Sequence, residues 1–140
     1  MVEAFNGAVI QLNDKESGVM ETVHSGYVAM DGSSMISVNS PVIRQRRKIR
    51  DEGVITVSVV LSKDNDVVGN PQISAPGSLD ADGDESLIVE LQEHVSRTVE
   101  KMPAKSKMVA IRDKIRSVVR KTISRELGKK PVIEVHIHHV

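Results

Sequence analysis

Cationic and titratable side chains gather in two short stretches of this sequence. The first is a dense basic run made of Arg44, Arg46, Arg47, Lys48 and Arg50. The second, close to the carboxyl end, holds Glu134, His136, His138 and His139. Arginine and lysine suit phosphate groups, whereas imidazole and carboxylate groups suit either zinc or a polar contact surface. The two stretches therefore predict a phosphate-binding helix and either a metal site or a contact strand.

The histidine-rich stretch has too few ligands on one side for a zinc site. It lies in an alternating apolar and polar run, which predicts a β-strand over residues 132–140. In a strand only His136 and His138 share a face, and Glu134 is the sole further candidate ligand on it. We therefore predict no metal site and favour a solvated or interface strand.

No other motif predicts catalysis by this chain. There is no cysteine, no glycine-rich phosphate loop and no nucleophile–base motif. Asp80, Asp82 and Asp84 alternate as in a calcium loop, but the twelfth position from Asp80 is Leu91 instead of the required glutamate. Asp82 or Asp84 is expected to cap the next helix instead.

The strongest strand signal is the run from Val54 to Leu61. Its odd positions are large and apolar, and its even positions, Val54, Thr56, Ser58 and Val60, form a milder set. This pattern predicts one buried face and one partly exposed face. Turn residues 63–66 favour a second strand that returns over residues 67–74.

Helical periodicity predicts two long helices after this hairpin, over residues 84–102 and 105–127. Pro103 separates them, and Gly128 ends the second. The predicted class is α+β: a small three-stranded sheet with both helices on one face. The expected core is Ile55, Val57, Val59, Leu61, Ile111, Ile115, Val119, Val135 and Ile137. Met108 and Val118 are also expected to be buried by the second helix.

The segment before the sheet divides into three parts. Residues 1–31 are expected to form short strands and turns with too few apolar side chains to be stable alone. Residues 32–41 are expected to be a linker. Ser40 and Pro41 then begin a helix that ends near Glu52 and displays the basic run.

Composition limits the function further. With one Phe, one Tyr and no Trp, the chain lacks the aromatic platforms on which single-stranded bases stack. No stretch approaches membrane-spanning length and no leader-like run is present at the start, so cytoplasmic localisation and no membrane contact are expected. Residues 64–100 have nine acidic and one basic residue, and residues 101–140 have eleven basic and three acidic. These blocks predict either mutual neutralisation or a basic surface for phosphate.

Several motifs, taken in order, resemble those of ribonuclease J. They are Asn6-Gly7-x-Val9-Ile10-x-Leu12, Gly26-Tyr27-Val28-x-x-Asp31-Gly32, Arg44-x-Arg46-Arg47-Lys48-Ile49, Gly53 before a Val-rich strand, and the run from Gly128 to His136. That family belongs to the β-CASP metallo-β-lactamases. The resemblance covers nearly the whole chain but only the carboxyl-terminal part of the family's length.

The resemblance implies three segments in this chain, and zinc and RNA as ligands of the parent enzyme. Residues 1–31 correspond to the last strands of a metallo-β-lactamase domain, 32–41 to a linker and 42–140 to the family's C-terminal α/β domain. The family's zinc ligands have no counterpart here, and His24 and His94 are isolated. We therefore expect zinc and RNA cleavage in the parent enzyme, and neither catalytic nor metal-binding residues in this chain.

Two classes of function remain open. One is an assembly domain that forms a homodimer through Val54, Thr56, Ser58, Val60, Glu134, His136 and His138, or through the exposed strand edge. The other is a basic module that binds RNA through Arg44, Arg46, Arg47, Lys48 and Arg50, together with the basic face of residues 105–130, and feeds it to a nuclease. The resemblance and the half-apolar sheet face favour assembly.

Overall fold

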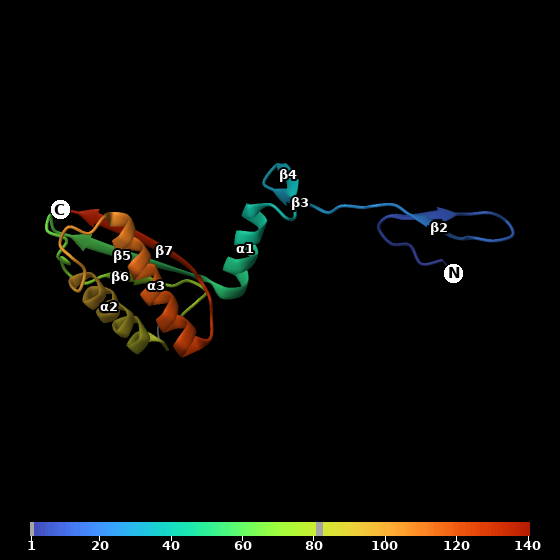
Figure 1. The fold of residues 1–140 in the computed structure, drawn as a ribbon. Helices are drawn as coiled ribbons and strands as arrows, with labels where there is room; N and C mark the ends of the chain where they lie inside the picture. The colour runs from blue at the N-terminus through green and yellow to red at the C-terminus, as the bar shows by residue number, and fades with distance from the viewer. Residues whose placement is uncertain (1, 81–82) are drawn as a thin grey trace. The chain divides into compact units, whose positions relative to one another are not determined.

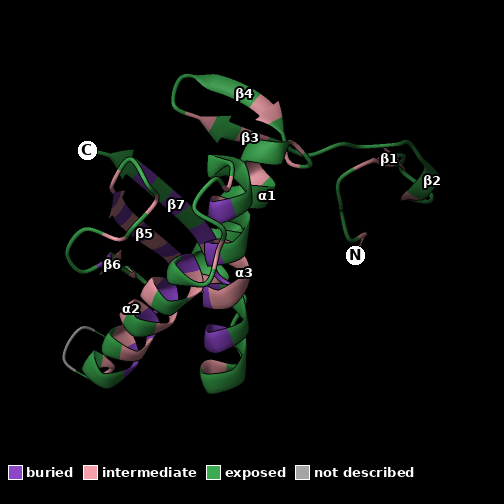
Figure 2. Cartoon of the chain, turned by 60° about the vertical axis from the view of Figure 1, so that its left-hand side comes forward, coloured by how far each residue is buried: buried purple, intermediate pink, exposed green. Residues whose placement is uncertain are grey.

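The computed structural model describes residues 2–80 and 83–140. The chain divides into two compact units, Met1–Arg44 and Gln45–Val140. Figure 1 shows the helices and strands of both units, with the β1 label in Figure 2. In the described residues no helix is long and apolar enough to cross a membrane.

The smaller unit consists of two β-hairpins. β1 (Ala8–Gln11) pairs with β2 (Gly18–Thr22), and β3 (Val28–Asp31) pairs with β4 (Ser34–Ser37), both antiparallel. The prediction of a linker is wrong for Ser34–Ser37, because Gly32, with φ of 61°, forms a two-residue turn that returns the chain along β3. None of the described residues 2–44 is buried. The unit therefore has no core of its own, as its composition predicts.

The larger unit is built on a three-stranded sheet in the order β6-β5-β7. β5 (Val54–Leu61) is central, antiparallel to β6 (Gln72–Ser74) and parallel to β7 (Val132–His139). The predicted return strand over 67–74 is largely wrong. Val67 forms an isolated bridge to Leu61, and regular pairing with β5 begins only at Gln72. Gly69, with φ of 72°, and Pro71, which lacks an N–H, interrupt the ladder between them.

Two helices cover one face of this sheet (Figures 1 and 2). They are α2 (Glu85–Glu100) and α3 (Met108–Leu127). α3 begins after Pro103 and a turn in which the Ser106 N–H donates to the Pro103 carbonyl over 2.8 Å. It ends as predicted, at Gly128, whose φ is 65°.

The core lies between the sheet and the two helices. Figure 2 shows buried positions along β5, β7, α2 and α3. All nine predicted core residues are buried, together with Leu87, Leu91, Val95, Val99, Ile123 and Ile133. Two predicted core positions on α3 are wrong: Met108 is 37% exposed and Val118 is only half-buried, because both lie to the side of the stripe that contacts the sheet.

The helix α1 (Pro41–Glu52) joins the smaller unit to β5. Its predicted N-cap is confirmed, since the Ile43 N–H donates to Ser40 Oγ over 3.3 Å. None of its residues is buried, and the apolar Val42 and Ile49 are 45% and 38% exposed. The basic helix is thus present as predicted, and two of its apolar side chains are partly exposed.

Candidate interface surfaces

The face of the sheet opposite α2 and α3, here called the open face, brings together the predicted contact residues. The parallel register places Thr56 beside Glu134, Ser58 beside His136 and Val60 beside His138. The antiparallel register adds Ser74 beside Thr56 and Gln72 beside Ser58. The sequence-predicted set therefore lies on one continuous surface across β5 and β7, which β6 extends on the other side of β5.

Burial differs between the strands of the open face. Val54, Thr56, Ser58 and Val60 are half-buried on the central strand, while Glu134, His136 and His138 are exposed on the outer strand. The face mixes methyl groups, hydroxyl groups, imidazoles and one carboxylate. Such a surface is suited to contact with another polar and apolar protein surface.

The histidines do not form a metal centre. Within the described ranges, no group of three or more His, Cys, Asp or Glu side chains is placed to hold a metal ion. His139 lies away from the other two, with its Nε2 3.1 Å from Asn65 Oδ1 at the far end of the sheet. The residues present therefore do not fit the zinc site of the family that the sequence resembles.

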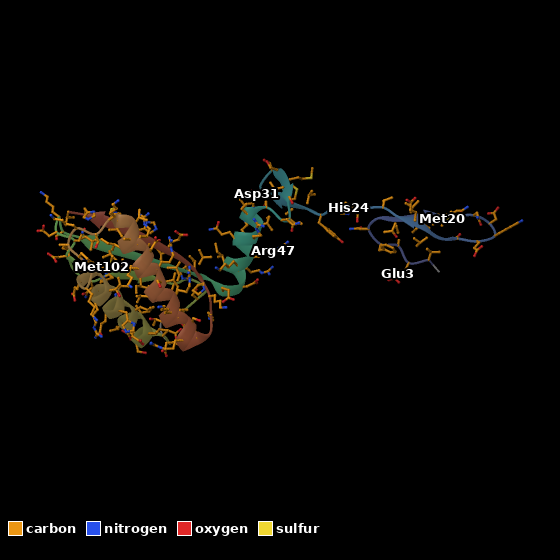
Figure 3. All side chains as sticks on the ribbon, viewed as in Figure 1. Glu3, Met20, His24, Asp31, Arg47 and Met102 are labelled. Atoms are coloured by element: carbon orange, nitrogen blue, oxygen red, sulfur yellow. The ribbon has the colours of Figure 1, made fainter. Side chains whose placement is uncertain are left out.

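The basic residues of α1 are divided between two sides of the helix. Arg44, Arg47 and Lys48 share one side, at i, i+3 and i+4, and Arg46 and Arg50 lie on another. Figure 3 shows the Arg47 side chain extending from α1. The sequence correctly places these cations on a helix, but they do not form a single basic face.

Arg50 of α1 has a carboxylate partner on the same helix. Arg50 Nε donates to Asp51 Oδ1 over 2.7 Å, and this bond raises the pKa of Arg50 and holds the pKa of the Asp51 carboxyl below its usual value. Both side chains are exposed. Arg50 is thus less available to a phosphate group than its position in the basic run indicates.

Charge neutralisation between the acidic and basic blocks is slight in the described residues. Across α2 and α3 one ion pair is recorded, from Arg125 Nη2 to Glu90 Oε1 at 2.8 Å. Glu126 and Glu90 together raise the pKa of Arg125, with Glu126 the stronger influence. Most cations of α3 therefore face solvent.

Asn65 has a structural role that its place in a predicted turn does not reveal. Its backbone is left-handed, with φ of 68°. Its Nδ2 donates to the Ala104 carbonyl over 2.5 Å and is 3.3 Å from the Ser106 carbonyl, while its Oδ1 meets His139. One side chain thereby ties the turn after β5 to the α2–α3 loop and to the end of β7.

These features define a class: an α+β domain in which two helices cover one face of a three-stranded sheet and the residues of the other face are half-buried or exposed. Residues 41–140 match the family model described as Ribonuclease J C-terminal domain. The chain belongs to the ribonuclease J family, and it corresponds to that family's C-terminal portion.

Two relatives illustrate the extent of the similarity. Over 138 residues, the chain is 32% identical to Ribonuclease J of Sinorhizobium meliloti, in an alignment that covers 96% of this chain and 24% of that protein. Over 130 residues, it is 26% identical to Ribonuclease J 2 of Staphylococcus epidermidis, covering 91% of this chain and 23% of that protein. The chain therefore spans about a quarter of the length of these relatives.

Proposed function

We propose that this chain is the assembly part of a zinc-dependent, ribonuclease J-like enzyme of RNA processing and decay, and that it forms a homodimer without contributing catalytic groups. In this proposal residues 1–31 end a metallo-β-lactamase domain and residues 42–140 make the dimer contact. The parent enzyme acts in the cytoplasm, binds zinc through residues outside this chain and cleaves RNA.

The observation that supports assembly most directly is the open face. On its central strand, Val54 and Val60 expose methyl groups beside the hydroxyl groups of Thr56 and Ser58. One helix layer covers only the other face of the sheet, so a second copy of the open face is a suitable cover. Two identical faces related by a two-fold axis form an isologous contact, the commonest route to a homodimer.

The experiment is a measurement of solution mass by sedimentation at several concentrations. We expect the unaltered chain to associate as its concentration rises. The double variant Thr56→Lys, Val60→Lys places two ammonium groups on each open face, and four within the proposed contact. Because like charges that lose water without partners strongly oppose association, this variant is expected to remain monomeric.

A matched control adds the same charge elsewhere. Val89→Lys, Val109→Lys substitutes two exposed valines on α2 and α3, 48% and 64% exposed, on the helical side of the unit. This control should associate like the parent chain. If the open-face variant keeps its fold and associates as strongly as the parent, the dimer contact is not the open face.

A second candidate, RNA binding, is favoured by one side of α1. In the described residues no ion pair is recorded for Arg44, Arg47 or Lys48, which share that side. Three phosphate contacts predict a slope of about −2 for log K against log salt with single-stranded RNA. A shallower slope, or equal binding by the Arg44→Gln, Arg47→Gln, Lys48→Gln variant, would rule out this helix as the RNA contact.

A further inference from the structure

β7 has one edge that no described strand pairs with, since the sheet order is β6-β5-β7. The Val132 N–H donates to the Gly53 carbonyl and the Val140 N–H to the Leu61 carbonyl, at 3.1 and 3.0 Å. The register between these two bonds is one to one, without a bulge. Alternate N–H groups of a strand point the same way, so those of Ile133, Val135 and Ile137 point away from β5. Their backbone groups are therefore available to another strand.

Two arginines border this edge. A groove of about 330 Å³ is lined by Arg112 and Arg116 of α3 and by residues 134–138 of β7. Val135 and Ile137 are 6% and 9% exposed, so these side chains offer little surface and their backbone is the accessible part of the strand. The groove thus combines strand backbone on one side with guanidinium groups on the other.

The two guanidinium groups have few hydrogen-bond or ion-pair partners among the described residues. Arg112 Nε is buried and has no hydrogen-bond partner among the described residues. A buried N–H without an acceptor destabilises the fold, and a bound acceptor removes that cost. Among the described residues the ion pair recorded for Arg116 is with Asp113, at 3.5 Å, and that carboxylate is itself 64% exposed. Arg112 Nε has almost no accessible surface, so a carboxylate would reach it only with an outward shift of that side chain, whereas the weakly paired Arg116 is 33% exposed and is reached directly.

We propose that this edge groove binds an acidic, extended peptide segment, which adds to β7 as a fourth strand and places two carboxylates against Arg112 and Arg116. Arg112 and Arg116 are one helical turn apart, about 6 Å along α3. Residues i and i+2 of a strand lie on one face about 6.6 Å apart. A Glu-x-Glu segment in strand conformation therefore matches the spacing of the two guanidinium groups.

The chemistry of the groove favours a peptide over RNA. In strand addition, main-chain hydrogen bonds give affinity and contacts to alternate side chains of the peptide give specificity. Here the backbone of β7 offers the hydrogen bonds, and the arginines of α3 offer contacts to the peptide's carboxylates. The large aromatic rings that best stack on bases are few, since the sequence has one Phe and one Tyr, at positions 5 and 27, and no Trp. This site borders the open face and shares Glu134, His136 and His138 with it, but it uses the backbone edge of β7 and the guanidinium groups of α3 instead of the β5 side chains.

The test uses the full 140-residue chain and three labelled peptides, Thr-Glu-Thr-Glu-Thr-Glu-Thr and its counterparts with Lys or Gln at the Glu positions. We expect the Glu peptide to bind, the Gln peptide to bind at least ten times more weakly, and the Lys peptide not to bind. The backbone amides of Val135 and Ile137 should become protected from hydrogen exchange when the Glu peptide is present. Protection confined to other strands, or equal binding of all three peptides, would overturn the proposal.

Two charge-matched variants locate the contact. Arg112→Gln, Arg116→Gln should lower affinity for the Glu peptide at least tenfold, whereas Lys114→Gln, Arg120→Gln removes the same charge from exposed positions of α3 and should change it less than twofold. Equal losses in the two variants would overturn the site, as would displacement of the Glu peptide by oligouridylate. Should the first variant fail to fold, the peptide series and amide protection on the unaltered chain still decide the question. Binding by Thr56→Lys, Val60→Lys should be normal even where that variant is monomeric, so the two proposals fail separately.

Discussion

Gly53 joins the end of α1 to the beginning of β5 at a point where there is no room for a side chain. Its φ is 77°, and a Cβ added there would lie 2.5 Å from the carbonyl group of Gly77. The Gly53 carbonyl also accepts the Val132 N–H at 3.1 Å, and its N–H donates to Ile49 at 2.8 Å. One residue therefore ends a helix, starts the central strand and contacts the last strand.

Substitution of Gly53 by alanine is expected to be strongly destabilising. A left-handed backbone costs a non-glycine residue about 1–2 kcal/mol, and the contact with Gly77 adds to this cost. Gly69→Ala is the matched control, because Gly69 has φ of 72° and no atom within 4 Å of an added Cβ. Chemical denaturation should give a larger loss of unfolding free energy for Gly53→Ala. Equal losses of unfolding free energy in the two variants would show that the backbone near Gly77 moves to accommodate the added methyl group with no loss of stability.

At this scale the sequence predicts some roles and not others. Gly53 is recognisable because it stands between a helical pattern and a β-branched run, and Gly128 is recognisable for the same local reason. Asn65 is not: its turn composition is local, but its partners Ala104 and His139 are distant in sequence. Arg112 is similar, since its periodicity places it on a helix but does not reveal that Nε is buried without an acceptor.

Apolar side chains hold the larger unit together. They recur at every second position in β5 and at helical spacing in α3, and they pack against one another in the core. Val57, the middle of the central strand, and Ile115, the middle of α3, are both fully buried. These side chains lie between the sheet and the helices and bury apolar surface of both layers. The stability of the unit should therefore depend on them more than on any surface charge.

Truncation at these two positions is the corresponding prediction. Val57→Ala and Ile115→Ala should each lower the free energy of unfolding by about 2 to 4 kcal/mol, since each leaves a cavity between packed layers. Val109→Ala, on the same helix as Ile115 but 64% exposed, should change it by less than about 0.5 kcal/mol. Denaturant titration of the three variants measures this. A loss below about 1 kcal/mol at either buried site would contradict the assigned packing.

The order of strands is harder to predict than the strands themselves. Both long strands are evident from period-two alternation, and both are found within one residue of the expected ends. That β7 pairs parallel to β5, while β6 pairs antiparallel on the other side, depends on how the α2–α3 hairpin crosses the sheet. Local propensity contains no information on that crossing. The sequence predicts a longer β6 than the structure has, because Val67 and Val68 favour a strand. Gly69 and Pro71 interrupt that strand.

At the scale of the whole molecule, the distribution of charge matters more than the balanced total. The formal net charge is zero, yet across α2 and α3 the described residues contribute one recorded ion pair. Several basic side chains of α3, among them Lys114, Arg120 and Lys121, are therefore exposed at the surface, and Arg112 and Arg116 border the edge of β7. Segregated charge of this kind favours recognition of oppositely charged partners.

The last prediction concerns catalysis by the isolated chain. We expect a clean preparation of these 140 residues not to hydrolyse RNA, with or without added zinc or manganese. Metal-assisted phosphodiester hydrolysis needs ions that generate hydroxide and clamp the scissile phosphate. The described residues offer no group of three His, Cys, Asp or Glu side chains to hold one.

The assay follows labelled single-stranded RNA at several metal concentrations, with and without a chelator. His136→Ala, His138→Ala is the control, because these two imidazoles share one face of β7. Cleavage that depends on metal, is lost with chelator and is lost in this double variant would mean that two copies of the chain complete a site that one copy lacks. That outcome would contradict an accessory role and make the open face catalytic. Loss of cleavage on further purification, with the double variant behaving like the parent, would instead identify a contaminating nuclease.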